Sequence, residues 1–375
     1  MKNRKIALIL GTRPEIIKLS PIIRRLERAR RDYFIIHTGQ HYSFELDRQF
    51  FKDLRLPRPR YRLNIHSHGV TLQAEHTGRM LVAIERILLK EMPGTVLVQG
   101  DTNSVLAGAL TVSKLVTTRA YTRIDIRLAH VEAGLRSYDR SMPEEINRFI
   151  TDHFSDSLFA PTKQAADILI REGVPKDRVF VTGNTIVDAV NDNLKLAVPS
   201  SALKRLAVRP RQYALLTLHR QENVDNPARL RLLLEGIGRV GRALGREIIF
   251  PVHPRAAKKI AAFRLKLPAG VRTVKPLGFL DFLSVESQAD LLLTDSGGVQ
   301  EEGCILGVPC VTLRESTERP ETVAVGANVI AGYQPEKVLG AALRMIGAPR
   351  GWKNPLGDGR ASERILRIVD RRSPP

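Results

Sequence analysis

The 375-residue sequence is poor in cysteine and in aromatic residues, and it has no long apolar segment. Its two cysteines, Cys304 and Cys310, lie in apolar surroundings and are too few for a disulfide framework, which fits a reducing compartment. No window approaches the roughly 18 consecutive apolar residues of a transmembrane helix. The apolar stretch from Lys5 to Leu10 is too short for a secretory signal. We therefore expect a soluble, cytoplasmic protein.

Acidic residues are the minority among the charges. The chain has 59 Lys and Arg against 39 Asp and Glu, a formal net charge of +20. A basic nucleic-acid-binding protein is one interpretation of such an excess. However, the basic residues are spread along the whole chain, and aromatic residues, which would stack on single strands, make up only 5%. We favour an arginine-rich surface together with phosphate binding, and we expect neither a nucleic-acid nor a membrane partner.

Short β-branched segments alternate with longer helical ones, and a second such series follows the polar stretch 191–210. This βαβα order predicts an α/β fold with parallel sheets covered by helices on both faces. The length suits two Rossmann-like domains, residues 1–190 with the C-terminal helix 355–375, and residues 191–354. The predicted strands are Ile6–Leu10, Tyr33–Thr38, Thr95–Gln99, Arg127–Val131, Ser157–Ala160, Tyr213–Leu218, Glu247–Val252, Leu291–Thr294 and Cys310–Leu313. The predicted helices are Pro14–Arg30, Leu72–Leu89, Ser104–Leu115, Glu144–Phe154, Pro227–Ala243, Val299–Leu306, Pro335–Met345 and Ala361–Val369.

One segment matches the dinucleotide-binding fingerprint. Gly236, Gly238 and Gly241 have the spacing G-x-G-x-x-G. The fingerprint requires a strand before it and a helix after it. Here a predicted helix precedes the glycines and a predicted strand follows them. We interpret them as glycines inside a helix and expect no nicotinamide cofactor there.

Polar loops follow the predicted strands of the first series, and ligands of open α/β sheets bind at these carboxyl ends. The first loop places Arg13 and Lys18 at the start of a helix, where two cations are unfavourable unless an anion binds. An ordinary helix start with solvated charges is the alternative interpretation.

Three further segments each offer a carboxylate, at Asp101, Glu132 and Glu144. Asp101 alone could be a helix N-cap, and Glu144 an ordinary acidic first turn. The recurrence of a carboxylate at three strand ends favours acid–base chemistry. We also expect Glu144 to pair with Arg148, four residues further along the helix.

The second series contributes a phosphate-binding pattern. His219 follows its first strand, and Ser296-Gly297-Gly298 opens a helix, so that backbone amides can approach a phosphate closely. Glu302 lies one to two turns into that helix, where its carboxylate can accept bonds from a ribose diol. Arg319 follows the next strand.

Taken together, seven segments in order resemble the non-hydrolysing UDP-N-acetylglucosamine 2-epimerases over nearly the whole chain. The resemblance implies a GT-B-like arrangement of two domains with the active site between them. It also implies a homodimer without metal or cofactor, in polysaccharide biosynthesis. The segments are GTRPE (11–15), QGDT (99–102), HVEAGLR (130–136), PEEINR (143–148), TLHRQEN (217–223), DSGGVQEE (295–302) and TERPE (317–321).

The resemblance also assigns residues. Phe282 is placed to contact uracil, with Phe279 as a rival, and Glu302 to hold the ribose. Bacterial relatives carry a second, regulatory substrate site, whose residues match Gln40, His41 and His253. The family's polar amide and arginine expected near Ser43 and Gly69 are missing, which puts activation by substrate in doubt. The UDP phosphates are assigned to Arg13, His219, Ser296, Gly297, Gly298 and Arg319, and the sugar to Lys18, Asp101, Glu132 and Glu144, with Arg136 added to the substrate-binding set.

The implied reaction is inversion at C2, whose proton is barely acidic because no carbonyl adjoins it. Elimination of UDP to a 2-acetamidoglucal and re-addition solves this problem without redox chemistry. We expect Asp101 and Glu144 to act on the proton and Glu132 to hold or tune them. Which carboxylate serves which face stays open, and crowding of carboxylates is expected to raise one pKa.

Four other functions remain open on the sequence. A 2-epimerase of a UDP-2,3-diacetamido uronic acid would need one more cation for the C6 carboxylate. A hydrolysing epimerase would release free N-acetylmannosamine. A GT-B glycosyltransferase would need an acceptor groove, and a basic nucleic-acid-binding protein would bind nucleic acid tightly and with strong dependence on salt.

Overall fold

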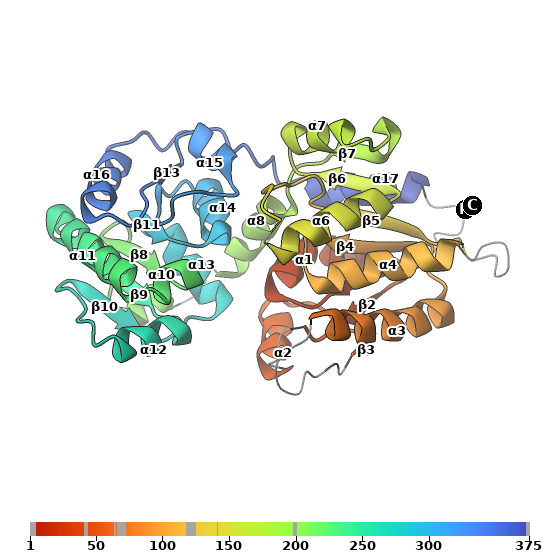
Figure 1. Cartoon of the computed structure of the whole chain (residues 1–375), viewed down its shortest axis with the longest axis horizontal. Coiled ribbons are helices and arrows are strands. Elements are labelled where there is room, and N and C mark those ends of the chain that lie inside the picture. Colours follow the sequence, from red (N-terminus) through yellow and green to blue (C-terminus); the bar gives the residue numbers. More distant parts are fainter. Residues whose placement is uncertain are drawn as a thin grey trace. The chain divides into compact units, whose positions relative to one another are not determined.

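The computed structural model describes residues 5–40, 44–63, 65, 73–117, 125–140, 142–197 and 201–372. The chain divides into two compact units, which we call unit 1 (Met1–Ala189 with Gly357–Pro375) and unit 2 (Val190–Leu356). Each unit is a parallel sheet with helices on both faces (Figure 1). This is the predicted α/β fold.

Within the described residues, the sheet of unit 1 has seven strands in the order β3-β2-β1-β4-β5-β6-β7. The central strands are buried on both faces, which is why β1 reads as the unbroken apolar run IALIL. The strands are β1 Ile6–Leu10, β2 Tyr33–His37, β3 Tyr61–Arg62, β4 Thr95–Gln99, β5 Arg127–Val131, β6 Ser157–Ala160 and β7 Val179–Val181. The helices are α1 Arg13–Arg28, α2 Phe44–Asp53, α3 Gln73–Glu91, α4 Asn103–Thr117, α6 Pro143–Phe154, α7 Lys163–Arg171, the 3₁₀ turn Lys176–Arg178 and α17 Ala361–Arg372. Helix α8, Thr185–Ala197, begins in unit 1 and continues into unit 2.

In the described part of unit 2 the sheet has six strands in the order β10-β9-β8-β11-β12-β13. Its strands are β8 Tyr213–Thr217, β9 Glu247–Pro251, β10 Val271–Val274, β11 Leu291–Thr294, β12 Cys310–Thr312 and β13 Asn328–Ile330. Its helices are α9 Ala202–Arg205, α10 Gln221–Val224, α11 Pro227–Leu244, α12 Pro254–Ala262, α13 Phe279–Ser287, α14 Gly297–Leu306, α15 Pro320–Ala324 and α16 Pro335–Ile346.

The strand order reverses once in each sheet, between β1 and β4 in unit 1 and between β8 and β11 in unit 2. At such a switch point the loops leaving neighbouring strands diverge to opposite faces and open a crevice at the carboxyl ends. The loops after β1 and β4 carry Arg13 and Asp101, and those after β8 and β11 carry His219 and Ser296. The topology therefore brings predicted site residues together in pairs.

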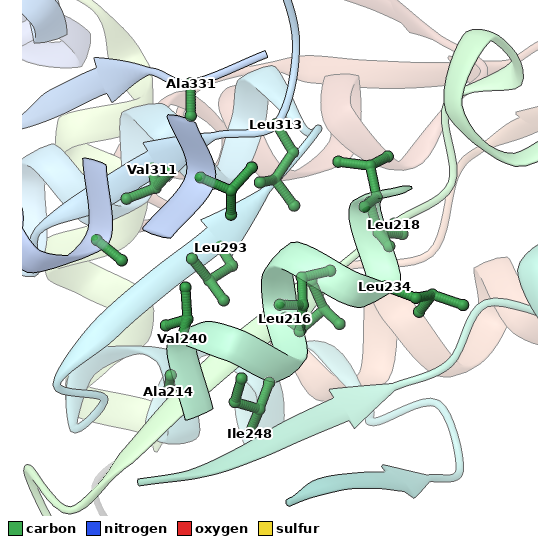
Figure 2. Close-up of a cluster of buried hydrophobic side chains, with 14 of the residues drawn as sticks. Ala214, Leu216, Leu218, Leu234, Val240, Ile248, Leu293, Val311, Leu313 and Ala331 are labelled. Carbon is green, nitrogen blue, oxygen red and sulfur yellow. The ribbon is translucent and has the colours of Figure 1, made fainter. Parts of the chain in front are cut away.

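The three fingerprint glycines lie inside α11, as predicted, and they permit close packing. A Cβ at Gly236 would lie 3.0 Å from Pro335 on α16, and one at Gly238 would lie 2.5 Å from Pro268. The apolar face of α11 covers one face of the unit 2 sheet. Its residues Leu234 and Val240 belong to a buried cluster with side chains from β8, β9, β11 and β12 (Figure 2).

The last helix belongs to unit 1. Asp188 accepts hydrogen bonds from the backbone amides of Ala361 (3.1 Å) and Ser362 (2.9 Å) at the start of α17, and Arg25 on α1 donates to the Ser362 hydroxyl (2.8 Å). Both cysteines are buried and free. Within the described residues, each helix is too short or too polar to cross a membrane.

Candidate active site

The loop after β1 starts α1 with a capping box. Thr12 is the N-cap, and Glu15 accepts from its backbone amide (2.6 Å) and from that of Gly11 (2.7 Å). Arg13, the first residue of the helix, is exposed, and its guanidinium carbon lies 5.9 Å from the ring centroid of Phe50 on α2. The positive charge thus stands at the positive end of the helix, as the sequence predicted, and is available to an anion.

Lys18 is buried and forms an ion pair with Glu132. Its Nζ lies 2.7 Å from Oε1 and 2.8 Å from Oε2 of that carboxylate, and the amide of Gln99 donates to the same carboxylate. The three side chains come from α1 and from the ends of β4 and β5. Glu132 has φ +70°, in the left-handed region that non-glycine residues rarely adopt. Such strain at a strand end is typical of functional positions.

Asp101 lies on a loop that is hydrogen-bonded along its backbone and its side chain. The Asp101 carboxylate accepts from Arg148 Nε (2.9 Å) and forms an ion pair with Nη2 (2.7 Å). Its carbonyl accepts from Asn147 (2.9 Å), and the preceding carbonyl of Gly100 accepts from His130 (2.8 Å). The side chain keeps 32% of its surface exposed. The carboxylate is therefore fixed in place yet open to a ligand.

The expected pair between Glu144 and Arg148 is wrong. Arg148 instead contacts Glu145 (2.6 Å) and Asp101, because Glu145 faces inward on α6 while Glu144 stands exposed on its first turn. Burial of Glu145 opposes its ionisation, but hydrogen bonds from the Ser137 and Tyr138 amides and from Arg148 lower its pKa. Glu145 thus holds the segment before α6, and Glu144 remains the solvent-facing carboxylate.

A buried polar network supports the β5 loop. His130 is fully buried, with Nδ1 2.7 Å from Asp152 and Nε2 2.8 Å from the Gly100 carbonyl. Arg136 pairs with Asp152 (2.7 Å) and Glu172 (2.6 Å), and its side chain is only 2% exposed. This placement argues against a direct substrate contact for Arg136 and makes it a support of the loop.

In unit 2, Asp295 organises the loop after β8. It is fully buried and accepts from the backbone amides of His219 (3.0 Å) and Arg220 (3.0 Å) and from the Asn223 amide (3.1 Å). The His219 ring nitrogen Nδ1 lies 3.0 Å from the same carboxylate. Although burial opposes ionisation, these contacts lower the pKa of Asp295. His219 therefore donates from Nδ1 to Asp295. The other ring nitrogen, Nε2, points away from Asp295, and the side chain is half-exposed.

The loop after β11 has the form of an anion site. Ser296 is the N-cap of α14, and Gly297 and Gly298 form its first turn. A Cβ at Gly298 would meet only Ser296 Oγ at 3.7 Å, and one at Gly297 only Glu318 at 3.9 Å. Neither glycine has a positive φ. Packing and backbone conformation do not require these glycines, which leave bare amides at the positive end of a helix.

The remaining predicted residues of unit 2 lie on α13, α14 and before α15. Glu302 is buried beside Glu286, and burial together with Glu302 raises the pKa of Glu286 well above its ordinary value. Arg319 Nε lies 2.5 Å from Glu301 Oε1. Phe282 packs against a buried cluster of unit 2, while its rival Phe279 is the first residue of α13.

The candidate regulatory residues are distributed over both units. Gln40 accepts from the amide (3.0 Å) and the hydroxyl (2.7 Å) of Ser104 at the start of α4, which gives it a local structural role. His253 is the N-cap of α12, and its ring centroid lies 6.0 Å from that of His219. Burial, His219 and Arg255 lower its pKa. His41, with Ser43 and Gly69, lies outside the described residues.

A cation contacts each of two predicted carboxylates. Arg148 contacts Asp101, and Lys18 contacts Glu132. In unit 1, burial raises the pKa of another carboxylate, Glu15, to about 7. Sequence reasoning missed Glu15 and Asp295 as site residues. Only their positions in the sequence could have indicated them. Glu15 lies three residues after the N-cap Thr12, and Asp295 directly follows strand β11.

The fold and these strand-end loops define a two-domain α/β protein of the GT-B-like class. One solved glycosyltransferase, that of kitacinnamycin, shares this fold with a TM-score of 0.60 at 13% identity. A family model described as UDP-N-acetylglucosamine 2-epimerase matches residues 24–370. The chain belongs to this family, as its motifs indicated, and it is an epimerase.

Relatives of known name cover nearly the whole chain. The UDP-N-acetylglucosamine 2-epimerase of Methanocaldococcus jannaschii is 54% identical over 97% of this chain and 98% of its own length. The UDP-2,3-diacetamido-2,3-dideoxy-D-glucuronate 2-epimerase of Pseudomonas aeruginosa is 39% identical over 97% and 99%.

A solved structure of the Methanocaldococcus jannaschii enzyme, in complex with UDP-GlcNAc and UDP, matches with a TM-score of 0.85 at 53% identity, covering 98% of this chain and 99% of the other.

Proposed function

We propose that this chain interconverts UDP-N-acetylglucosamine and UDP-N-acetylmannosamine by eliminating UDP to a 2-acetamidoglucal and adding it back, without hydrolysis. The observation that carries the proposal is the pair of cation-held carboxylates, Asp101 and Glu132, at the ends of adjacent strands β4 and β5. They occur in a chain 54% identical to an enzyme named for this substrate.

The chemistry follows from the substrate. In the elimination the C1–O bond breaks and its electron pair leaves with UDP, while the C2 proton passes to a carboxylate and a C1=C2 double bond forms. In the return step UDP oxygen attacks C1, and C2 receives a proton on the opposite face. No electrons are gained or lost, so the residues need only stabilise the leaving pyrophosphate and move one proton.

We assign the UDP moiety to unit 2 with help from Arg13. The amides at Ser296, Gly297 and Gly298 and the side chains of His219 and Arg319 hold the pyrophosphate as its charge develops. His219 suits this role because Asp295 fixes its Nδ1 proton and leaves Nε2 for the ligand. Glu302 holds the ribose, and Phe282 is assigned to the uracil.

We assign the sugar to unit 1. Asp101 and Glu144 exchange the C2 proton, the first held by Arg148 and the second exposed on α6. We assign the buried ion pair of Glu132 and Lys18 to positioning the sugar. We further propose that the enzyme is a cytoplasmic homodimer, for which light scattering should give about twice 41.9 kDa.

A related substrate is the second candidate. The Pseudomonas aeruginosa relative is named for a UDP-diacetamido uronic acid, yet at 39% it is less similar than the 54% relative named for UDP-N-acetylglucosamine. Identity over the same length therefore favours the neutral sugar. A uronic acid would need a cation for its C6 carboxylate.

The test is to incubate the purified enzyme with each nucleotide sugar and to separate the products. UDP-N-acetylmannosamine with no free sugar is expected. Free N-acetylmannosamine and UDP would indicate the hydrolysing reaction, and turnover of the uronic acid alone would overturn the substrate assignment.

The Asp101→Asn and Glu144→Gln variants should lose activity and keep UDP affinity. Glu85→Gln, at an exposed position on α3, is the control.

A further inference from the structure

Glu15 is a buried carboxylate that connects two loops. Its Oε2 accepts from the amides of Gly11 and Thr12 in the loop after β1, at 2.7 and 2.6 Å. Its Oε1 accepts from the hydroxyl of Thr102 in the loop after β4, at 2.6 Å. These two loops leave adjacent strands at the switch point of the sheet. One side chain therefore joins the two loops that carry Arg13 and Asp101.

Helix capping accounts for only part of this arrangement. A capping box needs the bond from the glutamate to the N-cap amide, which Thr12 supplies. It requires neither the bond to Thr102 nor the burial of the carboxylate, which is 1% exposed. Burial of an ionisable group opposes folding unless its contacts compensate. The bond across to the second loop is thus a feature that local helix formation leaves unexplained.

The loop after β4 is held from its other side as well. His130 bonds to the Gly100 carbonyl, and Asn147 bonds to the Asp101 carbonyl. Glu15, through Thr102, supplies an attachment that faces α1. Without that bond the loop would keep its bonds to β5 and α6 but would lose this direct bond to α1.

We propose that Glu15 and Thr102 form a clamp that aligns Asp101 with the first turn of α1, so that Glu15 is a positioning residue for proton transfer at C2. The inference rests on the proposed function, in which Asp101 exchanges the proton while Arg13 and Lys18 bind the substrate. A misplaced base slows the chemical step more than it weakens binding.

Thr102→Val tests the clamp because it removes the hydroxyl and keeps the shape of the side chain. Thr102 is also the N-cap of α4, where its hydroxyl accepts from the amide of Val105 (3.4 Å). The matched control is Thr162→Val, which removes the equivalent N-cap bond of α7 (3.2 Å) in the same unit. Thr162→Val should lose the thermal stability of one N-cap bond, and Thr102→Val should lose more because it also removes the bond to Glu15.

We expect the loss of the Thr102 hydroxyl to change kcat much more than KM. Thr102→Val should lower kcat for C2 epimerisation by about 10- to 100-fold, as expected for the loss of one hydrogen bond to a charged group, with KM within about threefold. Thr102→Ser should restore kcat, and Thr162→Val should leave it unchanged. Thr102→Ala repeats the test with a smaller side chain. Equal kcat in Thr102→Val and Thr162→Val would overturn the proposal.

Amide hydrogen exchange gives a measurement that does not depend on activity. The segment Gly100–Asn103 should exchange faster in Thr102→Val than in Thr162→Val. Failure of the wild type to epimerise UDP-N-acetylglucosamine would reject the proposed function. The exchange rates would then still show whether the bond between Glu15 and Thr102 holds the loop after β4. Equal protection of this segment in the two variants would reject the clamp itself.

Discussion

Replacing Glu15 by glutamine should change how stability depends on pH. Burial raises the pKa of Glu15 to about 7 from 4.5, although bonds from Thr102, Gly11 and Thr12 oppose the rise. Below pH 4.5 the native and unfolded chains both hold this proton, and between 4.5 and 7 only the native chain holds it. The stabilisation is therefore fully present below pH 4.5 and is lost as pH rises through 7.

At about 1.36 kcal/mol per pH unit, the difference between the two pKa values amounts to ~3 kcal/mol. Glutamine cannot titrate, so the free energy of unfolding of the wild type relative to Glu15→Gln should fall by that amount between about pH 4.5 and pH 8. Urea unfolding followed by far-UV circular dichroism measures it. Glu286, whose pKa is also raised, is present in both proteins and cancels from the difference.

The control for this experiment is Glu85→Gln, which replaces an exposed glutamate on α3 and should run parallel to the wild type. If the free energy of unfolding of Glu15→Gln also depended on pH as that of the wild type does, the reasoning would be refuted. It would mean that the three hydrogen bonds keep the carboxylate ionised in spite of its burial.

Two further substitutions test the two units separately. Asp295→Asn should lower UDP affinity by about 10- to 100-fold in calorimetry, since it removes the charge that orients His219; unchanged affinity would exclude that role. Lys18→Met should destabilise the protein by about 3–5 kcal/mol in urea unfolding, because it leaves the buried Glu132 without its ion-pair partner, and should also reduce kcat; wild-type stability would show that the pair is solvated.

The sequence predicted the buried strands more accurately than the exposed ones. Ile6–Leu10, Thr95–Gln99 and Arg127–Val131 have the predicted bounds, because strands buried on both faces appear as continuous apolar runs. The four edge strands, Tyr61–Arg62, Val179–Val181, Val271–Val274 and Asn328–Ile330, were missed. They have two to four residues each and are only partly buried, so they are too short to show a clear pattern.

The candidate site could be predicted as a set of positions but not as a set of contacts. Motif order identified Asp101, Glu132 and His219, because strand ends and helix starts can be located from local pattern. The partners of these residues depend on which way each side chain faces. Arg148 selects Glu145 and Asp101 over Glu144 because of the orientation of α6, which spacing alone does not fix. The bond from Thr102 to Glu15 likewise joins segments far apart in the sequence.

Proton exchange at C2 is the central claim, and a single measurement tests it most directly. The enzyme is incubated with UDP-N-acetylglucosamine in D₂O and followed by proton NMR. The account predicts UDP-N-acetylmannosamine that carries deuterium at C2, with deuterium also entering the recovered substrate. Formation of the epimer with its original C2 proton would contradict elimination and re-addition, and the absence of any epimer would contradict the proposed activity itself.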